Sequence, residues 1–135
     1  AIYTDITLFR WKVVESPICK FCDLKEEQTL KHLYWQCLVT QRFWTLFQNW
    51  IDANTQQYPD LQWIMIPMCN SGVSKFLDFS IATAKLHIHR RKCMDKPPSF
   101  FVWLQQLKEW RNLEKYHAIS TGRTKSYVAK WSFLK

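Results

Sequence analysis

The sequence predicts an all-α fold, in which a small metal-stabilised lobe precedes a compact bundle of about three to four helices. The chain has only two glycines among 135 residues, and it shows no turn signals between alternating apolar residues that would indicate β-hairpins. Apolar residues recur instead at helical spacing in three long stretches. The first 37 residues lack this periodicity and hold four metal-ligating side chains. We therefore expect one domain, with the lobe over residues 1–37 packed against a helical basic region over residues 38–135.

The lobe is predicted from Cys19, Cys22, His32 and Cys37, spaced C-x2-C-x9-H-x4-C. Three thiolates and one imidazole are a ligand set of structural zinc, and four protein ligands leave no position for a water. His32 and Cys37 lie about 140° apart on an α-helix at roughly 100° per residue, so a helix from Thr29 must open or end before Cys37. We expect one structural zinc ion. The alternative is a set of unpaired buried cysteines beside a surface histidine.

The remaining elements follow from the apolar pattern. Residues 1–17 form either a short helix or an extended arm, which we expect to pack against the lobe. An amphipathic helix begins at Leu38, and residues 51–70, in which two prolines flank LQWIMI, form a short strand or an irregular buried segment. The stripe of the helix from Leu38 consists of Val39, Phe43, Leu46, Phe47 and Trp50. Trp44 lies off this stripe; we expect it to form a second layer of the core, and the alternative is that its ring contacts a nucleobase.

Three further helices complete the prediction. One begins near Ser71 and places His87 on its core face and His89 on its basic side. The next runs from Phe100 to about Ser120, with Ser99 as its N-cap and Gly122 as its stop. A short final helix turns one apolar face back to the core. That face consists of Tyr127, Val128, Trp131 and Leu134.

Positive charge is concentrated in the second part of the chain. Residues 1–84 carry 7 Lys and Arg against 8 Asp and Glu, whereas residues 85–135 carry 12 against 3. Such a basic segment is typical of polyanion binding, with a membrane surface or an acidic protein as lesser alternatives and a merely soluble surface as the plainest one. Two basic strips beside apolar stripes are the candidate nucleic-acid-binding residues. They comprise Lys85, His89, Arg90, Arg91 and Lys92 on one helix and Lys108, Arg111 and Lys115 on another.

The motifs resemble a known family. CKFC at 19–22, HLYWQC at 32–37 and the Phe43-Trp44 pair resemble the zinc-binding segment at the carboxyl end of non-LTR (LINE-type) retrotransposon polyproteins. The resemblance continues more weakly through AKLHIHRRK at 84–92 and KPPSF at 96–100. It implies a carboxyl-terminal module that helps to hold element RNA, target DNA or both during target-primed reverse transcription. It also implies that the remainder of the polyprotein is a partner, in a nuclear and cytoplasmic ribonucleoprotein without membrane contact.

Catalytic motifs are missing from the sequence. It has no glycine-rich phosphate loop, no G-x-S-x-G, no H-E-x-x-H and no convincing pair of carboxylates. We therefore expect no catalysis by this segment. A second zinc site from Cys69, His87, His89 and Cys93 is a weaker hypothesis, because the two histidines diverge on a helix. The alternative function is a zinc-stabilised scaffold that docks on the polymerase domain or on a host protein.

Overall fold

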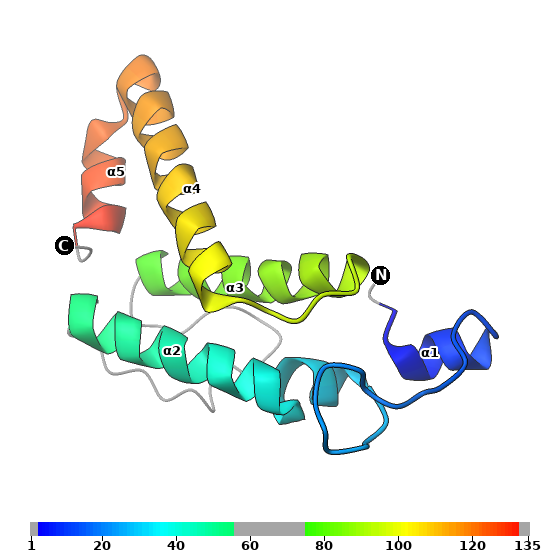
Figure 1. The fold of residues 1–135 in the computed structure, drawn as a ribbon. Coiled ribbons are helices and arrows are strands. Elements are labelled where there is room, and N and C mark those ends of the chain that lie inside the picture. Colours follow the sequence, from blue (N-terminus) through cyan, green and yellow to red (C-terminus); the bar gives the residue numbers. More distant parts are fainter. Residues whose placement is uncertain (1–2, 56–74, 133–135) are drawn as a thin grey trace. The chain divides into compact units, whose positions relative to one another are not determined.

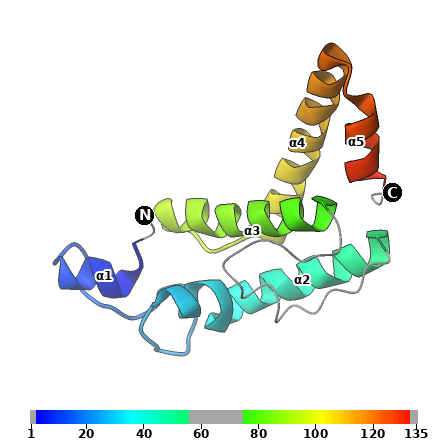
Figure 2. The ribbon, with the colours of Figure 1, turned by 180° about the vertical axis from the view of Figure 1, so that it is seen from behind.

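The structure is a computed structural model that describes residues 3–55 and 75–132. All regular elements in these residues are helical (Figure 1, and from behind in Figure 2), which confirms the all-α class. An isolated antiparallel bridge joins Ile18 to Glu27. None of the helices in these two segments has the length and apolarity needed to cross a bilayer. The elements are α1 (Asp5–Arg10), the π-helical turn η1 (His32–Gln36), α2 (Leu38–Thr55), α3 (Lys75–Cys93), α4 (Phe100–Thr121) and α5 (Thr124–Trp131).

Contacts group the chain into two units. Unit 1 contains residues 1–45 and 85–98, and unit 2 contains residues 46–84 and 99–135. This division differs from the predicted boundary after residue 37. The difference arises because α2 and α3 each contribute to both units, so that the carboxyl-terminal part of α3 joins the lobe.

The core of unit 1 lies where the start of α2 meets the end of α3. Phe43 is buried, and its ring stacks on His87 with 5.6 Å between ring centroids. The predicted core position of His87 is therefore confirmed. Trp44 is also buried and stacks on Trp35 at 5.2 Å, so its role is that of a core residue.

Large aromatic side chains form part of the core of unit 2. Trp103 of α4 is fully buried, contacts Phe47 of α2 at a centroid distance of 5.0 Å and donates from Nε1 to Thr83 Oγ1 over 3.2 Å. Trp131 of α5 is buried and contacts Phe76 of α3 at 5.4 Å. Helices α4 and α5 lie side by side (Figures 1 and 2). Of the predicted apolar face of α5, Trp131 is buried and Tyr127 is half-buried, while Leu134 lies outside the described residues.

The buried face of α2 differs from the predicted stripe. Leu46 is 42% exposed, whereas Thr40, Trp44 and Ile51 are buried. At roughly 100° per residue, the true face is rotated by about 70° from the predicted one. The sequence did not indicate this rotation, because Thr40 is polar and Trp44 lies off the predicted apolar stripe. Val128, also predicted to face the core, is 58% exposed, whereas Lys130 and Trp131 are the residues of α5 that contact Phe79 of α3.

The limits of α4 agree with the prediction. Ser99 caps the helix, because its Oγ accepts from Val102 N over 3.4 Å. Gly122 ends it in the left-handed region at φ 70°. Residues 1–17 contain the short helix α1 of the two alternatives. The predicted irregular connector and the predicted start of α3 near Ser71 fall largely on residues 56–74, outside the described residues.

Candidate metal site

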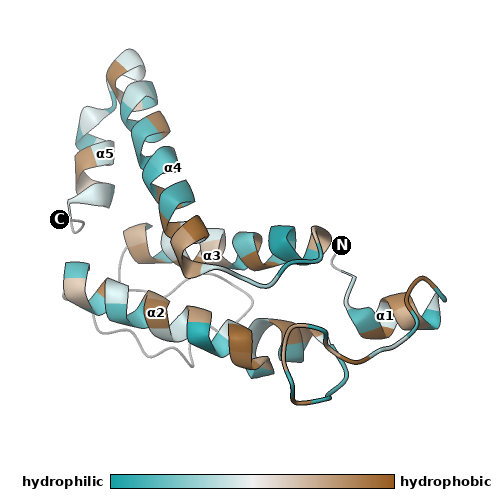
Figure 3. Ribbon diagram, viewed as in Figure 1, coloured by the Kyte–Doolittle hydropathy of each residue, from teal (hydrophilic) through white to brown (hydrophobic). Residues whose placement is uncertain are grey.

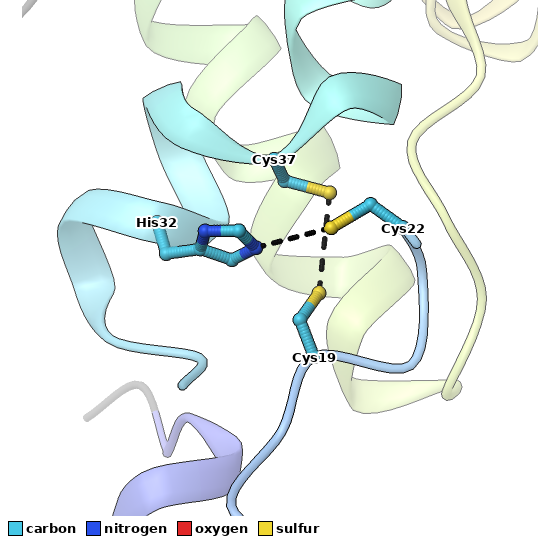
Figure 4. A group of neighbouring side chains, drawn as sticks. All are labelled: Cys19, Cys22, His32 and Cys37. Carbon is cyan, nitrogen blue, oxygen red and sulfur yellow. Dashed lines mark hydrogen bonds between the residues drawn. The ribbon is translucent and has the colours of Figure 1, made fainter. Parts of the chain in front are cut away.

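The four predicted ligands converge in unit 1. Their ligand atoms all lie within 4.8 Å of one another, and Cys19, His32 and Cys37 are buried while Cys22 is half-buried. Figure 4 shows the two sulfurs of the Cys19–Cys22 turn facing the side chains of His32 and Cys37. The distances are 3.4 Å from Cys22 Sγ to His32 Nε2 and 3.9 Å from Cys19 Sγ to Cys37 Sγ. This cluster can hold one metal ion.

A π-helical turn brings the second ligand pair together. The amide of Cys37 donates to the carbonyl of His32 over 2.8 Å, which is the i to i+5 bond of a π-helix. This bond aligns two residues that an α-helix would separate by about 140°. The expectation that the helix must open before Cys37 is therefore confirmed, and the opening is the wide turn η1.

The wide turn leaves two carbonyls without their α-helical donors, and α2 supplies replacements. Thr40 Oγ1 donates to the carbonyl of Leu33 over 2.7 Å. Trp44 Nε1 donates to the carbonyl of Tyr34 over 2.8 Å. Because unpaired buried carbonyls are costly, these two side chains stabilise the turn that orients the ligands.

Two further polar residues, Gln28 and Glu26, lie next to the cluster. Gln28 is fully buried and donates from Nε2 to Cys19 Sγ over 3.5 Å, while its Oε1 accepts from the amide of Asp5 over 3.0 Å. The carboxylate of Glu26 lies 3.4 Å from His32 Nδ1, close enough for charge pairing although not oriented as a hydrogen bond. The N-terminal segment thus packs against the lobe, as predicted.

The thiols of Cys19 and Cys37 lie 3.9 Å apart, and each shifts the pKa of the other. The hydrogen bond between them is the largest cause that lowers the pKa of Cys19, to about 4. The same bond, together with burial, raises the pKa of Cys37 far above the usual range of a thiol. Binding of a metal ion would displace the thiol protons that remain on the cluster.

The candidate nucleic-acid-binding residues of α3 lie in unit 1, and one of them is misassigned. Lys92 is only 7% exposed, and its Nζ lies 2.6 Å from Asp5 Oδ1. The predicted phosphate contact of Lys92 is wrong in this fold, because a buried carboxylate already pairs its charge. Arg90 is exposed, and Arg91 is half-buried with its Nε donating to the carbonyl of Pro97 over 2.9 Å. Lys85 and His89 are half-buried.

The candidate residues of α4 lie in unit 2. Lys108 and Lys115 are exposed, and Arg111 is half-buried. Figure 3 shows a hydrophilic stretch along the middle of this helix. The two strips belong to different units, so a groove bordered by both stays a prediction.

The second zinc site predicted from the sequence is not assembled by the described residues. Its Cys69 lies outside them, His89 Nε2 is 3.7 Å from Cys93 Sγ, and His87 packs on Phe43 instead.

Several functional residues have no signature in the sequence. Asp5 pairs with a lysine 87 positions away, and Gln28 lies in a polar stretch with no periodicity. The one available signal was Asp5 in the first turn of a short helix, where acidic residues are common for another reason.

Comparison of the chain with protein-family models, with curated proteins and with solved structures finds no match.

Proposed function

We propose that this chain is a non-catalytic nucleic-acid-binding module whose Cys/His cluster holds one structural zinc ion. The exposed face of α4 carries this proposal, because a run of three cations lies along it between two exposed aromatic rings. In keeping with the resemblance of its motifs to LINE-type polyproteins, the module would hold element RNA, target DNA or both during target-primed reverse transcription. Endonuclease and polymerase chemistry would belong to other parts of such a polyprotein.

The distances in the cluster support zinc. With Zn–S bonds of about 2.3 Å and Zn–N bonds of about 2.0–2.1 Å, a tetrahedral ion separates sulfur from nitrogen by about 3.6 Å and sulfur from sulfur by about 3.8 Å. The observed pairs are 3.4 Å for Cys22 with His32 and 3.9 Å for Cys19 with Cys37. The donor set is soft and complete, which suits a structural rather than a catalytic ion.

The face of α4 supports nucleic-acid binding. Phe101, Lys108 and Lys115 recur at intervals of seven residues, so they form one line about 21 Å long at 1.5 Å per residue. Phe101 is 72% exposed and Tyr116, next to Lys115, is 75% exposed. Lysines neutralise phosphates, and exposed aromatic rings stack on unpaired bases.

A salt series with and without the strip tests the proposal. The parent and a Lys108→Ala/Arg111→Ala/Lys115→Ala variant are titrated with single-stranded RNA and with duplex DNA. Each phosphate contact contributes about 0.7 to 0.9 to the slope of log K against log salt. We expect weaker binding of the variant and a slope smaller by about 2, with unchanged zinc content.

A variant with the same change in charge serves as the control. Arg10, Lys31 and Arg42 are exposed and lie outside both predicted strips, so their replacement by alanine removes the same three charges. For this control, the slope of log K against log salt should differ from the parental slope by no more than about 0.7 to 0.9, the contribution of one contact. Equal slopes for the parent and both triple variants would reject the α4 face as a nucleic-acid surface.

The second candidate function is a protein-docking scaffold. It is favoured by apolar side chains near the end of α4, where Leu113 is 65% exposed and Ile119 is 61% exposed. Exposed apolar side chains that cluster on a surface mark docking sites. A scaffold would bind its partner with little salt dependence and would be weakened by Ile119→Ser, whereas the nucleic-acid surface would not.

A further inference from the structure

A cavity in unit 1, separate from the Cys/His cluster, has the character of a ligand site. Its volume is about 330 Å³, and none of the four cluster ligands lines it. The wall includes the buried pair of Asp5 and Lys92, the imidazole of His89 and the half-exposed ring of Tyr3. Lys20 and Asp95 line it and are exposed. The cavity thus combines a buried polar wall with an aromatic ring and exposed charges.

Two buried polar atoms at this cavity lack hydrogen-bond partners among the described residues. Asp5 is 1% exposed; its Oδ1 accepts from Lys92 Nζ, but Oδ2 has no partner. His89 Nδ1 is the other atom, since the ring approaches Cys93 Sγ through Nε2 at 3.7 Å. Buried polar groups are almost always paired with protein, water or a ligand. Protein atoms cover both in the structure, so a polar ligand in the cavity would pair with them once their side chains turn toward it.

A metal ion explains these atoms less well. An ion held by His89 Nε2 and Cys93 Sγ would have only two protein ligands, and it would leave both His89 Nδ1 and Asp5 Oδ2 unpaired. Among the described residues, the only group of three or more His, Cys, Asp or Glu placed to hold an ion is the cluster already described. The cavity therefore calls for an organic ligand with its own donors and acceptors.

The chemistry of the wall specifies the ligand. Asp5 and Lys92 compensate each other, so the part that enters is neutral, and it must donate to a carboxylate oxygen while offering a polar atom to His89. We propose that this cavity takes a single unpaired nucleobase, with its polar edge toward Asp5 and His89 and its face toward Tyr3. Nucleobases combine flat apolar faces with donors beside acceptors on one edge. Lys20 is placed for the attached phosphate, and Asp95 is an acceptor for a sugar hydroxyl.

This inference rests on the proposed function only where the base belongs to a bound strand, because a free nucleotide carries the same chemistry. The zinc-loaded chain is titrated with each of the four ribonucleoside 5′-monophosphates, and then with single-stranded and duplex oligonucleotides. NMR signals of the Tyr3 and His89 rings report occupancy. We expect saturable shifts with at least one monophosphate, together with a preference for single strands over duplex.

Variants at Tyr3 give the decisive comparison. Stacking of one base on one ring changes affinity by roughly five-fold to a hundred-fold, so Tyr3→Ala should weaken monophosphate and single-strand binding within this range. Tyr3→Phe keeps the ring and should bind like the parent. Phe9→Ala removes a 44% exposed ring of α1 that does not line the cavity, and it should also bind like the parent. His89→Ala should weaken binding without loss of zinc.

The outcomes separate the two proposals. If no monophosphate binds and Tyr3→Ala leaves the affinity for single strands unchanged, the cavity is not a base site, whatever the α4 variants show. If monophosphates bind through Tyr3 while strands of every kind do not bind, the cavity takes free nucleotides and the nucleic-acid function fails. If only strand binding depends on Tyr3, the base comes from the strand.

Discussion

The sequence and the structure assign opposite roles to Lys92. On the sequence it belongs to a phosphate-binding strip, whereas in the structure its ammonium lies 2.6 Å from Asp5 Oδ1 and also over the ring of Phe21 at 5.6 Å. The side chains of the pair are 6% and 1% exposed. Removal of one partner from a buried ion pair leaves the other charge unpaired, which costs about 3–5 kcal/mol. Lys92→Met should therefore lower the free energy of unfolding by about this amount.

The assay is urea unfolding of the zinc-loaded chain, combined with a double-mutant cycle. Asp5→Leu alone should also be strongly destabilising, because it leaves Lys92 unpaired. The double variant Asp5→Leu/Lys92→Met should recover much of the loss, because both charges are then gone. A loss below about 1 kcal/mol for Lys92→Met, together with a salt slope of RNA binding reduced by one contact, would refute the structural role and restore the phosphate contact.

Three further predictions concern the cluster, the end of α4 and a buried tyrosine. Cys22→Ser should lower bound zinc below half an equivalent in a metal assay, and a chelator should unfold at least unit 1 of the parent, because a structural ion contributes folding energy. Gly122→Ala should lower the free energy of unfolding by about 1 kcal/mol: a Cβ meets nothing within 4 Å, so the cost is that of φ +70° alone. Burial, with a smaller effect of Cys93, raises the pKa of Tyr34 to about 12; absorbance titration should show it ionising above exposed tyrosines. Since the unfolded pKa is near 10, the stability linked to Tyr34 is present below pH 10 and is lost between about pH 10 and 12.

The helices and the ligand set could be predicted from local pattern. Ser99 and Gly122 predicted the two limits of α4 because caps depend on one residue and its nearest neighbours. The C-x2-C-x9-H-x4-C spacing predicted the four residues that converge, and the five-residue interval predicted that the helix opens. The bridging π turn itself depends on Thr40 and Trp44, which lie in α2 and carry no signal for the turn.

The buried faces were harder to predict, because burial depends on partners distant in sequence. Thr40 and Trp44 are buried since they bond the carbonyls of η1, and this turned the face of α2 away from Leu46. The pairing of Lys92 with Asp5 crosses 87 positions. In the sequence, Lys92 has the same spacing as an exposed lysine of a basic strip. Only the packing of α1 beside the end of α3 distinguishes the two.

Gln28 connects the metal cluster to α1, and its replacement is the sharpest test of that connection. It is buried, donates to Cys19 Sγ and accepts from the amide of Asp5. Groups that bond metal ligands typically change metal affinity 10-fold to 100-fold when removed. Gln28→Leu keeps the volume and removes both bonds, so zinc affinity in a chelator competition should fall by about that factor.

Gln28→Leu should also affect α1. Because the amide of Asp5 loses its acceptor, hydrogen exchange over α1 should accelerate, and the pair of Asp5 and Lys92 should weaken with it. Gln41 is exposed, and Gln41→Leu is the matched control, which should leave both zinc affinity and exchange unchanged. If Gln28→Leu lowers zinc affinity but α1 exchanges as in the parent, the helix is held by its other contacts, which include the Asp5–Lys92 pair and the bond from the amide of Ile6 to the carbonyl of Gln28. If neither property changes, the cluster and α1 fold independently, and chelation should then leave the Asp5–Lys92 pair intact.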